Sequence, residues 1–421
     1  MDLSTGQEHV RDCIGCGLCL ESCPTYVLWG QEADSPRGRI ALIGETIAAG
    51  GVADDELTVH TDRCLGCMAC VSTCPSGVRF DQLLARARPA VERRRRRPTP
   101  QRAARKLALA TIPHPRRLGP VAGLAQAADG AGRRRRVPDA AYALANLVPA
   151  QTGSGAARST NSPIPASTSA RSSPPRGRVG LLLGCLQRVF FADVHLATIE
   201  VLADEGYDVF APTLPECCGA LERQAGEQRA GLKRAQQTIQ AFSTLGGVDH
   251  IVTTSGVCGG ELTRYGDMLG TAQARAFSAI VRDLSELLTQ QPPRTPRGRL
   301  PIRVAYHASC QLEHVQGVHD QPLALLRQIP ELQVVEPASH AYVCCGGAGL
   351  TPLLQPQTAT ELGERAAAAL SSPRVDAVVT GSHECAAHLS RHLRGATWPS
   401  PPPVRHPVQL VRDSIQAARR A

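Results

Sequence analysis

The sequence predicts an α+β multi-domain protein, with a small helical N-terminal domain followed by two tandem α/β domains that contain parallel sheets. Half of the sixteen cysteines lie in two short runs near the N-terminus, and the other half recur as an internal repeat. An arginine-rich segment separates the two groups. At roughly 100–200 residues per domain, the 421-residue chain allows this division. We place the four segments at residues 1–92, 93–178, 179–295 and 300–421.

The composition excludes several classes of protein. Hydrophobic residues make up 43% of the chain but aromatic residues only 3%, so the cores must consist mainly of Ala, Leu, Val and Ile. No apolar run approaches the roughly 18 residues of a membrane span, and the first residues do not have the pattern of a secretory signal. We therefore expect a cytoplasmic protein without a transmembrane segment. In that compartment clustered cysteines more often bind metal or do redox chemistry than form disulfides.

Two cysteine runs near the N-terminus have the same spacing, Cys-x-x-Cys-x-x-Cys-x-x-x-Cys-Pro, beginning at Cys13 and at Cys64. This spacing is typical of bacterial-type ferredoxins with two [4Fe–4S] clusters, in which the fourth cysteine of each run binds the other cluster. Zinc explains the pattern less well, since it needs only two separated Cys-x-x-Cys pairs. We assign Cys13, Cys16, Cys19 and Cys74 to the first cluster, and Cys64, Cys67, Cys70 and Cys23 to the second.

The other eight cysteines form an internal repeat. Its first copy contains Cys185, Cys217, Cys218 and Cys258, and its second copy contains Cys310, Cys344, Cys345 and Cys385. The adjacent pairs and the last cysteines are each separated by 127 residues, and each pair is followed by glycine. These cysteines are candidate metal ligands. The sequence leaves open whether either copy holds a further iron–sulfur cluster, a zinc ion or no metal.

Strands and helices alternate in both copies, which favours a parallel sheet in each. We expect strands at Arg178–Gly184, Tyr207–Ala211, His250–Thr254, Ile302–Tyr306, Gln333–Glu336 and Ala377–Thr380, and helices at Glu227–Leu245 and Thr358–Leu370. The cysteines then follow the carboxyl ends of strands, where ligands of open α/β sheets bind. Helix N-termini at these positions are expected to lower the pKa of the thiols.

The residue three positions after the last cysteine of each copy could add a ligand. It is Glu261 in the first copy and His388 in the second, and His388 is the better candidate for a metal ligand. A histidine at this spacing is as often an ordinary residue of a helix face. Structural or surface roles are at least as strongly expected for His307, His314 and His383.

The arginine-rich segment holds 14 Lys/Arg against one acid, Asp129, between residues 93 and 136. Short helices are expected at Gln101–Thr111, Gly119–Ala128 and Asp139–Leu147, and residues 151–178 have the Ser/Pro/Gly-rich composition of a linker. A solvated helix face is the preferred interpretation, ahead of membrane or partner docking. Nucleic acid is not expected as a partner, because no aromatic residues accompany the arginines.

Beyond the cysteines, several segments carry a resemblance to a known family. They are Cys23-Pro-Thr-Tyr, Asp34-Ser-Pro-Arg-Gly-Arg-Ile, Thr73-Cys-Pro-Ser-Gly-Val, Cys217-Cys-Gly-Ala, Arg264-Tyr-Gly-Asp-Met-Leu and Cys344-Cys-Gly-Gly-Ala-Gly. The chain resembles the iron–sulfur subunit of glycolate oxidase (glycolate dehydrogenase). That family has a two-cluster ferredoxin domain and two cysteine-rich domains of the heterodisulfide reductase type. The segment 34–40 discriminates best, because plain ferredoxins lack it.

The resemblance implies a role in electron transfer, as a subunit that does not itself oxidise substrate. Partner subunits that bind FAD would oxidise glycolate to glyoxylate, and electrons would leave through this chain toward a membrane acceptor such as quinone. The sequence contains no Gly-x-Gly-x-x-Gly after a strand, so we expect no flavin in this chain and no catalytic residue. The implied location is the inner face of the cell membrane. Related complexes acting on lactate or glycerol 3-phosphate, and a non-catalytic metal-binding adaptor, are the alternatives.

Overall fold

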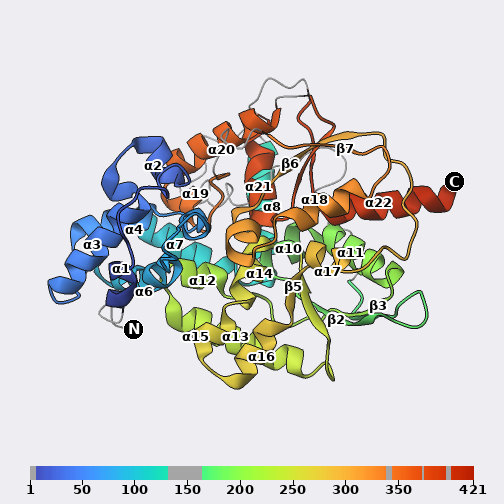
Figure 1. Ribbon diagram of the computed structural model, residues 1–421, viewed down its shortest axis with the longest axis horizontal. Coiled ribbons are helices and arrows are strands. Elements are labelled where there is room, and N and C mark those ends of the chain that lie inside the picture. The colour runs from blue at the N-terminus through green and yellow to red at the C-terminus, as the bar shows by residue number, and fades with distance from the viewer. Residues whose placement is uncertain (1–5, 131–163, 338–343, 372–373, 395–399) are drawn as a thin grey trace.

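The structure is a computed structural model that describes residues 6–130, 164–337, 344–371, 374–394 and 400–421. The N-terminal helices lie at one end of the long axis, and the two sheets with their covering helices occupy the rest (Figure 1). The helix expected at residues 139–147 and the first part of the expected linker, to residue 163, lie outside the described residues. Among the described helices, none is both long enough and apolar enough to cross a membrane.

The N-terminal part is helical. Its elements are α1 (Gln7–Arg11), α2 (Pro24–Trp29), the 3-10 helix η2 (Glu32–Asp34), α3 (Pro36–Ala48), α4 (Asp55–Arg63), α5 (Ala69–Ser72) and α6 (Phe80–Arg94). Helix α3 begins where Pro36 fixes the first turn and the Ser35 side chain accepts a hydrogen bond from the Gly38 amide. Buried side chains such as Leu57 and Leu83 join α3, α4 and α6 in one core. The two cysteine runs are loops attached to this core.

The next two helices, α7 (Thr99–Thr111) and α8 (Pro115–Gly130), belong to the arginine-rich segment, and they cover the helices expected at 101–111 and 119–128. Buried Ala108 of α7 packs in one cluster with Leu350 and Leu353 of the second repeat. The alanine-rich face of this segment is therefore part of the folded structure rather than a loose connection.

The first repeat contains a five-stranded sheet with the order β1-β3-β2-β4-β5. Its strands are β1 (Ser167–Thr168), β2 (Gly177–Leu181), β3 (Tyr207–Phe210), β4 (His250–Thr253) and β5 (Val281–Asp283). Only β1 is antiparallel to its neighbour. Its helices are α10 (Cys185–Phe190), α11 (Ala192–Asp204), α12 (Ala220–Gln224), α13 (Gln228–Ser243), α14 (Gly256–Leu262), α15 (Tyr265–Leu269), α16 (Ala272–Ala279) and α17 (Leu284–Thr289).

The second repeat contains a parallel four-stranded sheet with the order β7-β6-β8-β9. Its strands are β6 (Arg303–His307), β7 (Gln333–Val335), β8 (Ala377–Thr380) and β9 (Val404–Arg405). Its helices are the π-helix η4 (Gln311–Gln316), α18 (Asp320–Arg327), α19 (Thr351–Leu354), α20 (Pro356–Ser371), α21 (His383–His392) and α22 (Pro407–Arg420). All six expected strands are present, and the largest difference is that β2 ends at Leu181 rather than Gly184.

One hydrophobic core joins the two repeats. It contains Val179 and Leu202 from the first repeat together with Val304 and Val408 from the second, and all four are fully buried. Helices α11 and α22 pack against each other in this core. The two sheets therefore form one body, with the cysteine-bearing strand ends held at fixed positions relative to each other.

Candidate metal centres

The cysteines assigned to the first cluster line one small cavity. Cys13, Cys16, Cys19 and Cys74 share it with Cys70 of the second run. The loop between them turns at Gly15 (φ 72°) and Gly17 (φ 84°), conformations that residues with a side chain rarely adopt. Cys16 is exposed, so this group lies at the surface.

The cysteines assigned to the second cluster lie deeper. Burial raises the pKa of Cys67 well above its ordinary value, and the nearby sulfurs of Cys310 and Cys23 raise it further. Burial likewise raises the pKa of Cys70, with added contributions from Cys67, Cys64, Cys23 and Cys19. The four cysteines assigned to the second cluster therefore lie near one another, and Cys70 also lies beside the first group.

This arrangement fits two iron–sulfur clusters. Each group offers four sulfur atoms, the donors that such clusters use, and the structure contains no disulfide among these free cysteines. The positive φ angles at Gly15, Gly17 and Gly66 turn the backbone around each group. A disulfide or an isolated buried thiol would need neither the four-sulfur groups nor these turns.

A buried ionic network surrounds Cys23. Arg39 donates to the Cys23 sulfur at 3.8 Å and to the hydroxyl of Thr25 at 3.0 Å. Asp34, which is fully buried, pairs with Arg39 at 3.3 Å and Arg63 at 2.8 Å, and with the Nδ1 atom of His60 at 2.8 Å. The segment 34–40 therefore forms the environment of one predicted ligand of the second cluster.

The four cysteines of the first repeat also meet. The sulfur atoms of Cys218 and Cys258 lie 3.4 Å apart. A hydrogen bond with Cys185 lowers the pKa of Cys217, while the same bond and burial raise the pKa of Cys185. The expectation that a helix N-terminus would lower the pKa of the thiol is thus wrong for Cys185, the first residue of α10, because burial and its thiol neighbour have the larger effect.

In the second repeat the cysteines are joined by a series of thiol hydrogen bonds that runs through Cys310, Cys344, Cys345 and Cys385. His307, at the end of β6, lies with Cys345 and Cys385 in a buried group whose ligand atoms are all within 4.8 Å of one another. Sequence reasoning placed His307 among the structural histidines. The sequence offers one signal for it: His307 directly follows the expected strand 302–306 and stands three residues before Cys310. Its approach to Cys385 depends on the pairing of His307 with Thr380, which only the structure shows.

Glu261 and His388, the residues three positions after the last cysteine of each repeat, have other contacts. Glu261 forms a buried ion pair with Arg223, with both oxygens near Nε at 2.7 and 2.8 Å. His388 bonds through Nε2 to the carbonyl oxygen of Ala359 at 3.0 Å, and its ring packs on His392. Neither residue lies in the buried His307–Cys345–Cys385 group.

The remaining histidines that the sequence singled out have structural contacts. His314 pairs through Nδ1 with the hydroxyl of Ser72, at 2.8 Å, across the contact with the N-terminal part. His383 packs edge-on against Phe191, with the ring centres 4.6 Å apart.

A small, mainly apolar cavity of about 70 Å³ lies between the two repeats. All four cysteines of the first repeat line it, and Gly347, Glu384 and His388 of the second repeat form the facing wall. Burial raises the pKa of Glu384, whose carboxylate accepts from the hydroxyls of Ser255 and Ser382. The cysteines of the first repeat are therefore in contact with groups from both repeats.

The cysteine loop that begins at Cys64 contacts the second repeat. Gln311 donates from Nε2 to the carbonyl oxygen of Gly66 at 2.8 Å, and Leu65 packs with Cys344 in one apolar cluster. Gln311 begins the π-helix η4, a form that often occurs at functional sites. Gln316, at the other end of η4, donates to the carbonyl oxygen of Gly256 at 2.9 Å. This hydrogen bond connects η4 to the first repeat.

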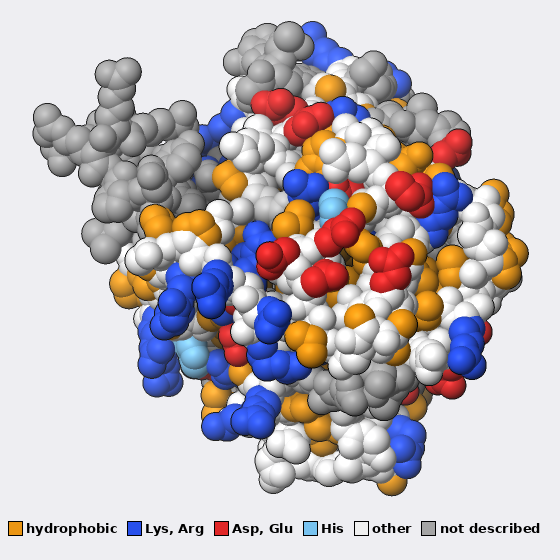
Figure 2. Space-filling view, turned by 90° about the vertical axis from the view of Figure 1, so that its left-hand side faces the viewer, with side chains coloured by type: hydrophobic (Ala, Val, Ile, Leu, Met, Phe, Trp, Pro, Cys, Tyr) orange, Lys and Arg blue, Asp and Glu red, His pale blue; other side chains and the backbone are white. Residues whose placement is uncertain are grey.

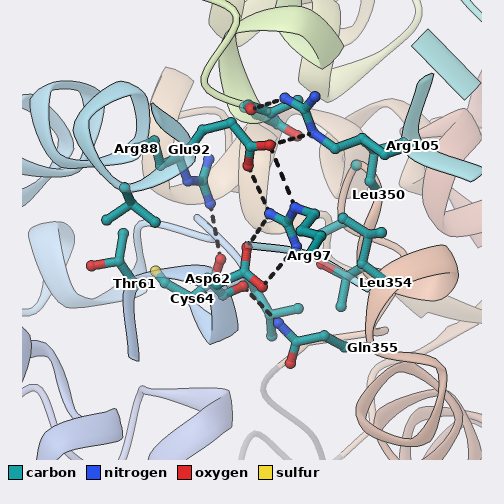
Figure 3. Close-up of a pocket in the computed structure, with 17 residues that line it drawn as sticks. Thr61, Asp62, Cys64, Arg88, Glu92, Arg97, Arg105, Leu350, Leu354 and Gln355 are labelled. Atoms are coloured by element: carbon teal, nitrogen blue, oxygen red, sulfur yellow. Dashed lines mark hydrogen bonds and ion pairs between the residues drawn. The ribbon is translucent and has the colours of Figure 1, made fainter. Parts of the chain in front are cut away.

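A third cavity, of about 60 Å³, lies where the N-terminal helices, α7 and the second repeat meet. Figure 3 shows Arg97 between the carboxylates of Asp62 and Glu92, with N–O distances of 2.7 and 2.8 Å. In the same view Arg88 donates to the backbone oxygen of Cys64 at 2.9 Å. The last arginine of the run 93–97 therefore stabilises the junction beside the second cysteine run.

The fold and these cysteine groups define an iron–sulfur protein with a ferredoxin-like dicluster domain and two cysteine-rich α/β domains. Residues 12–78 match the 4Fe-4S dicluster domain family, and residues 179–263 and 304–390 match the family described as cysteine-rich domain. The chain is 31% identical to the glycolate oxidase iron–sulfur subunit of Escherichia coli (strain K12), covering 97% of this chain and 94% of that protein. The chain belongs to the family of glycolate oxidase iron–sulfur subunits.

Two further relatives are similar to this chain. The probable glycolate oxidase iron–sulfur subunit of Bacillus subtilis (strain 168) is 32% identical, over 90% of this chain and 88% of that protein. Lactate utilization protein A of Geobacillus kaustophilus (strain HTA426) is 32% identical, over 41% of this chain and 73% of that protein. These relatives and the matched domains support an iron–sulfur subunit that transfers electrons.

Proposed function

We propose that the chain is the electron-transfer subunit of a flavin-dependent glycolate dehydrogenase complex. Partner subunits with FAD oxidise glycolate, and this chain carries the electrons toward a quinone at the inner face of the cell membrane. The relatives named as glycolate oxidase iron–sulfur subunits, matched over 94% and 88% of their lengths, support this proposal.

The observation that carries the proposal is the contact between an exposed and a buried cysteine group. Cys70 of the second group lines the cavity of the first group, and its pKa is influenced by Cys19. When bound, iron–sulfur clusters supply one-electron redox chemistry. The chain's own residues hold the two sites side by side and keep water from the inner one, because Cys23 and Cys67 are buried.

The exposed group also supports a protein partner. Ile14 and Leu18 flank Cys16 and are 73% and 59% exposed, among the largest exposures of any hydrophobic side chain in the described part of the chain. A projecting apolar loop beside a redox site suits contact with another protein. The end of the molecule that carries the N-terminal helices has acidic and basic side chains with hydrophobic ones between them, not a uniformly basic surface (Figure 2). This pattern favours a protein partner over a nucleic acid on that face.

Lactate is the second candidate donor. Lactate utilization protein A matches over 73% of its own length, although it covers only 41% of this chain. Glycolate and lactate are both 2-hydroxy acids, and the donor would be selected by the partner subunits. The longer matches favour glycolate.

The test uses the native complex, purified without oxygen, with either substrate as donor. In the variants Cys16→Ser and Cys67→Ser, glycolate should still reduce the flavin of the partner subunits, but quinone reduction should be lost. Ser243→Ala, at the exposed end of α13 in the first repeat, is the control and should leave both steps intact. Normal quinone reduction in both cysteine variants would refute the proposal, and lactate as the better donor would select the second candidate.

A further inference from the structure

We propose that the second repeat holds a single zinc ion bound by His307, Cys345 and Cys385, with a fourth thiolate from Cys344 or Cys310. This inference goes beyond the proposed function, because zinc has no redox chemistry and the site would act as a structural centre. It depends on the geometry of the second repeat and not on the identity of the electron donor.

The spacing of the ligand atoms favours one ion. The nitrogen of His307 and the sulfurs of Cys345 and Cys385 all lie within 4.8 Å of one another. A tetrahedral zinc ion with metal–ligand distances of about 2.0–2.3 Å places its ligands roughly 3.5–4 Å apart. Small side-chain adjustments therefore suffice to close the site, whereas an iron–sulfur cluster would need its ligands farther apart.

The three groups are buried together. His307 is 1% exposed, Cys345 3% and Cys385 6%. Structural zinc sites are closed sites of this kind with four protein ligands, and Cys and His are the donors that zinc prefers. The fourth thiolate would come from outside this group of three: Cys344 is adjacent to Cys345 in the chain and shares a hydrogen bond with Cys310, so one of these two sulfurs would move toward the ion.

The surroundings of His307 orient its ring. Strands β6 and β8 pair His307 directly with Thr380, and the His307 Nδ1 atom lies 3.0 Å from the Thr380 hydroxyl. Histidine ligands commonly use one ring nitrogen for such a contact, which fixes the ring and leaves the other nitrogen for the metal. In the proposed site Nε2 is the ligand atom.

The first repeat provides an internal comparison. Leu182 stands three residues before Cys185, as His307 stands three residues before Cys310, and Leu182 is fully buried in an apolar cluster. Thr253 occupies the position that corresponds to Thr380. The two copies thus differ at the imidazole, so the second repeat alone has the mixed donor set and we expect one zinc ion per chain.

The test measures metal and sulfide in the full-length protein purified without oxygen, together with zinc X-ray absorption. We expect about one zinc per chain with one nitrogen and three sulfur neighbours. Cys385→Ser should remove the zinc without reducing iron or sulfide. His307→Leu, which copies the first repeat, should lower the zinc content at least tenfold.

Two further variants keep the test decisive. His307→Cys should restore zinc with four sulfur neighbours, so that a folding defect in His307→Leu can be separated from loss of a ligand. His388→Leu is the matched control and should retain zinc, because His388 already bonds to Ala359. Wild-type protein without zinc, loss of iron and sulfide in Cys385→Ser, or a nitrogen neighbour that persists in His307→Cys would each overturn the proposal.

Discussion

The guanidinium of Arg39 donates a hydrogen bond to the sulfur of Cys23, at 3.8 Å, in the interior of the N-terminal part. Cys23 ends the first cysteine run, and we assign it to the cluster whose other ligands belong to the second run. Asp34 balances the charge of Arg39 from a fully buried position. The segment 34–40 therefore supplies both a positive charge and an N–H donor to one sulfur ligand, and both are known to raise the potential of iron–sulfur clusters.

Replacing Arg39 should shift the reduction potential of one cluster. Arg39→Met removes the charge and the donor, so we expect the potential to fall by roughly 60 mV, a tenfold change in a one-electron equilibrium. Arg39→Lys keeps the charge and should shift it less. Arg63→Gln is the control, because Arg63 contacts Asp34 but not Cys23 in the described contacts. The measurement is a redox titration followed by electron paramagnetic resonance, and equal shifts in the Arg39→Met and Arg63→Gln variants would contradict a direct effect on Cys23.

The exposed loop around Cys16 should be required for partner binding but not for cluster assembly. Ile14→Asp and Leu18→Asp place a charge on the apolar contact, so we expect binding of the flavin subunits to weaken at least tenfold. Iron content and the low-temperature resonance signals should stay unchanged. Val52→Asp is the matched control, since Val52 is 57% exposed and lies outside the cysteine loops. Copurification and titration of the subunits measure the effect, and unaltered binding in the Ile14→Asp and Leu18→Asp variants would exclude this loop as the contact surface.

Local sequence signals predicted the elements of the fold well. Hydrophobic runs located all six strands of the repeats within a few residues. The repeated cysteine spacing also grouped Cys345 with Cys385, which lie in one buried group of the structure. These features depend on short segments, whose periodicity and spacing the sequence displays directly. The shared core of the two repeats was not predictable in this way, because it depends on how α11 and α22 pack against each other.

The histidines show why the sites were predicted less completely. Spacing after Cys385 favoured His388, one turn later on α21, but the orientation of that helix directs His388 to Ala359. His307 reaches Cys385 instead, because β6 lies beside β8. The ion pairs of Asp34 could not be predicted from local sequence either, because its partners Arg39 and Arg63 come from separate helices. Which side chains meet across two elements is set by tertiary packing.

The arginine run 93–97 contains one residue with a clear structural role. The Arg97 side chain is 5% exposed and bridges Asp62 and Glu92 (Figure 3). Arg97→Met leaves two partly buried carboxylates without this cation, so we expect a loss of about 2–3 kcal/mol in unfolding free energy. Arg93→Met, at an exposed position of the same run, should change it by less than about 0.5 kcal/mol. Denaturant midpoints measure both, and equal stability of the two variants would show that the Arg97 network contributes nothing.

Two histidines in the shared core should make the protein sensitive to acid. Burial lowers the pKa of His195 to about 4 and that of His406 to about 3, against an ordinary value of 6.5. Because both pKa values are lower in the folded state, the unfolded chain binds more protons as the pH falls below 6.5. The stability is therefore complete above pH 6.5 and declines below it, by about 2 kcal/mol per histidine at pH 5.

Variants that do not titrate should remove this part of the acid sensitivity. His195→Gln can still donate to the carbonyl oxygen of Leu183, and His406→Asn can still cap α22. Between pH 7.5 and pH 5 each variant should lose about 2 kcal/mol less stability than the wild-type protein, as measured by denaturant midpoints. His319→Gln replaces a histidine whose side chain is 55% exposed, and it serves as the comparison for loss of an imidazole at the surface. If His195→Gln and His406→Asn lost as much stability between pH 7.5 and pH 5 as the wild-type protein, protonation of the buried imidazoles would not limit acid stability.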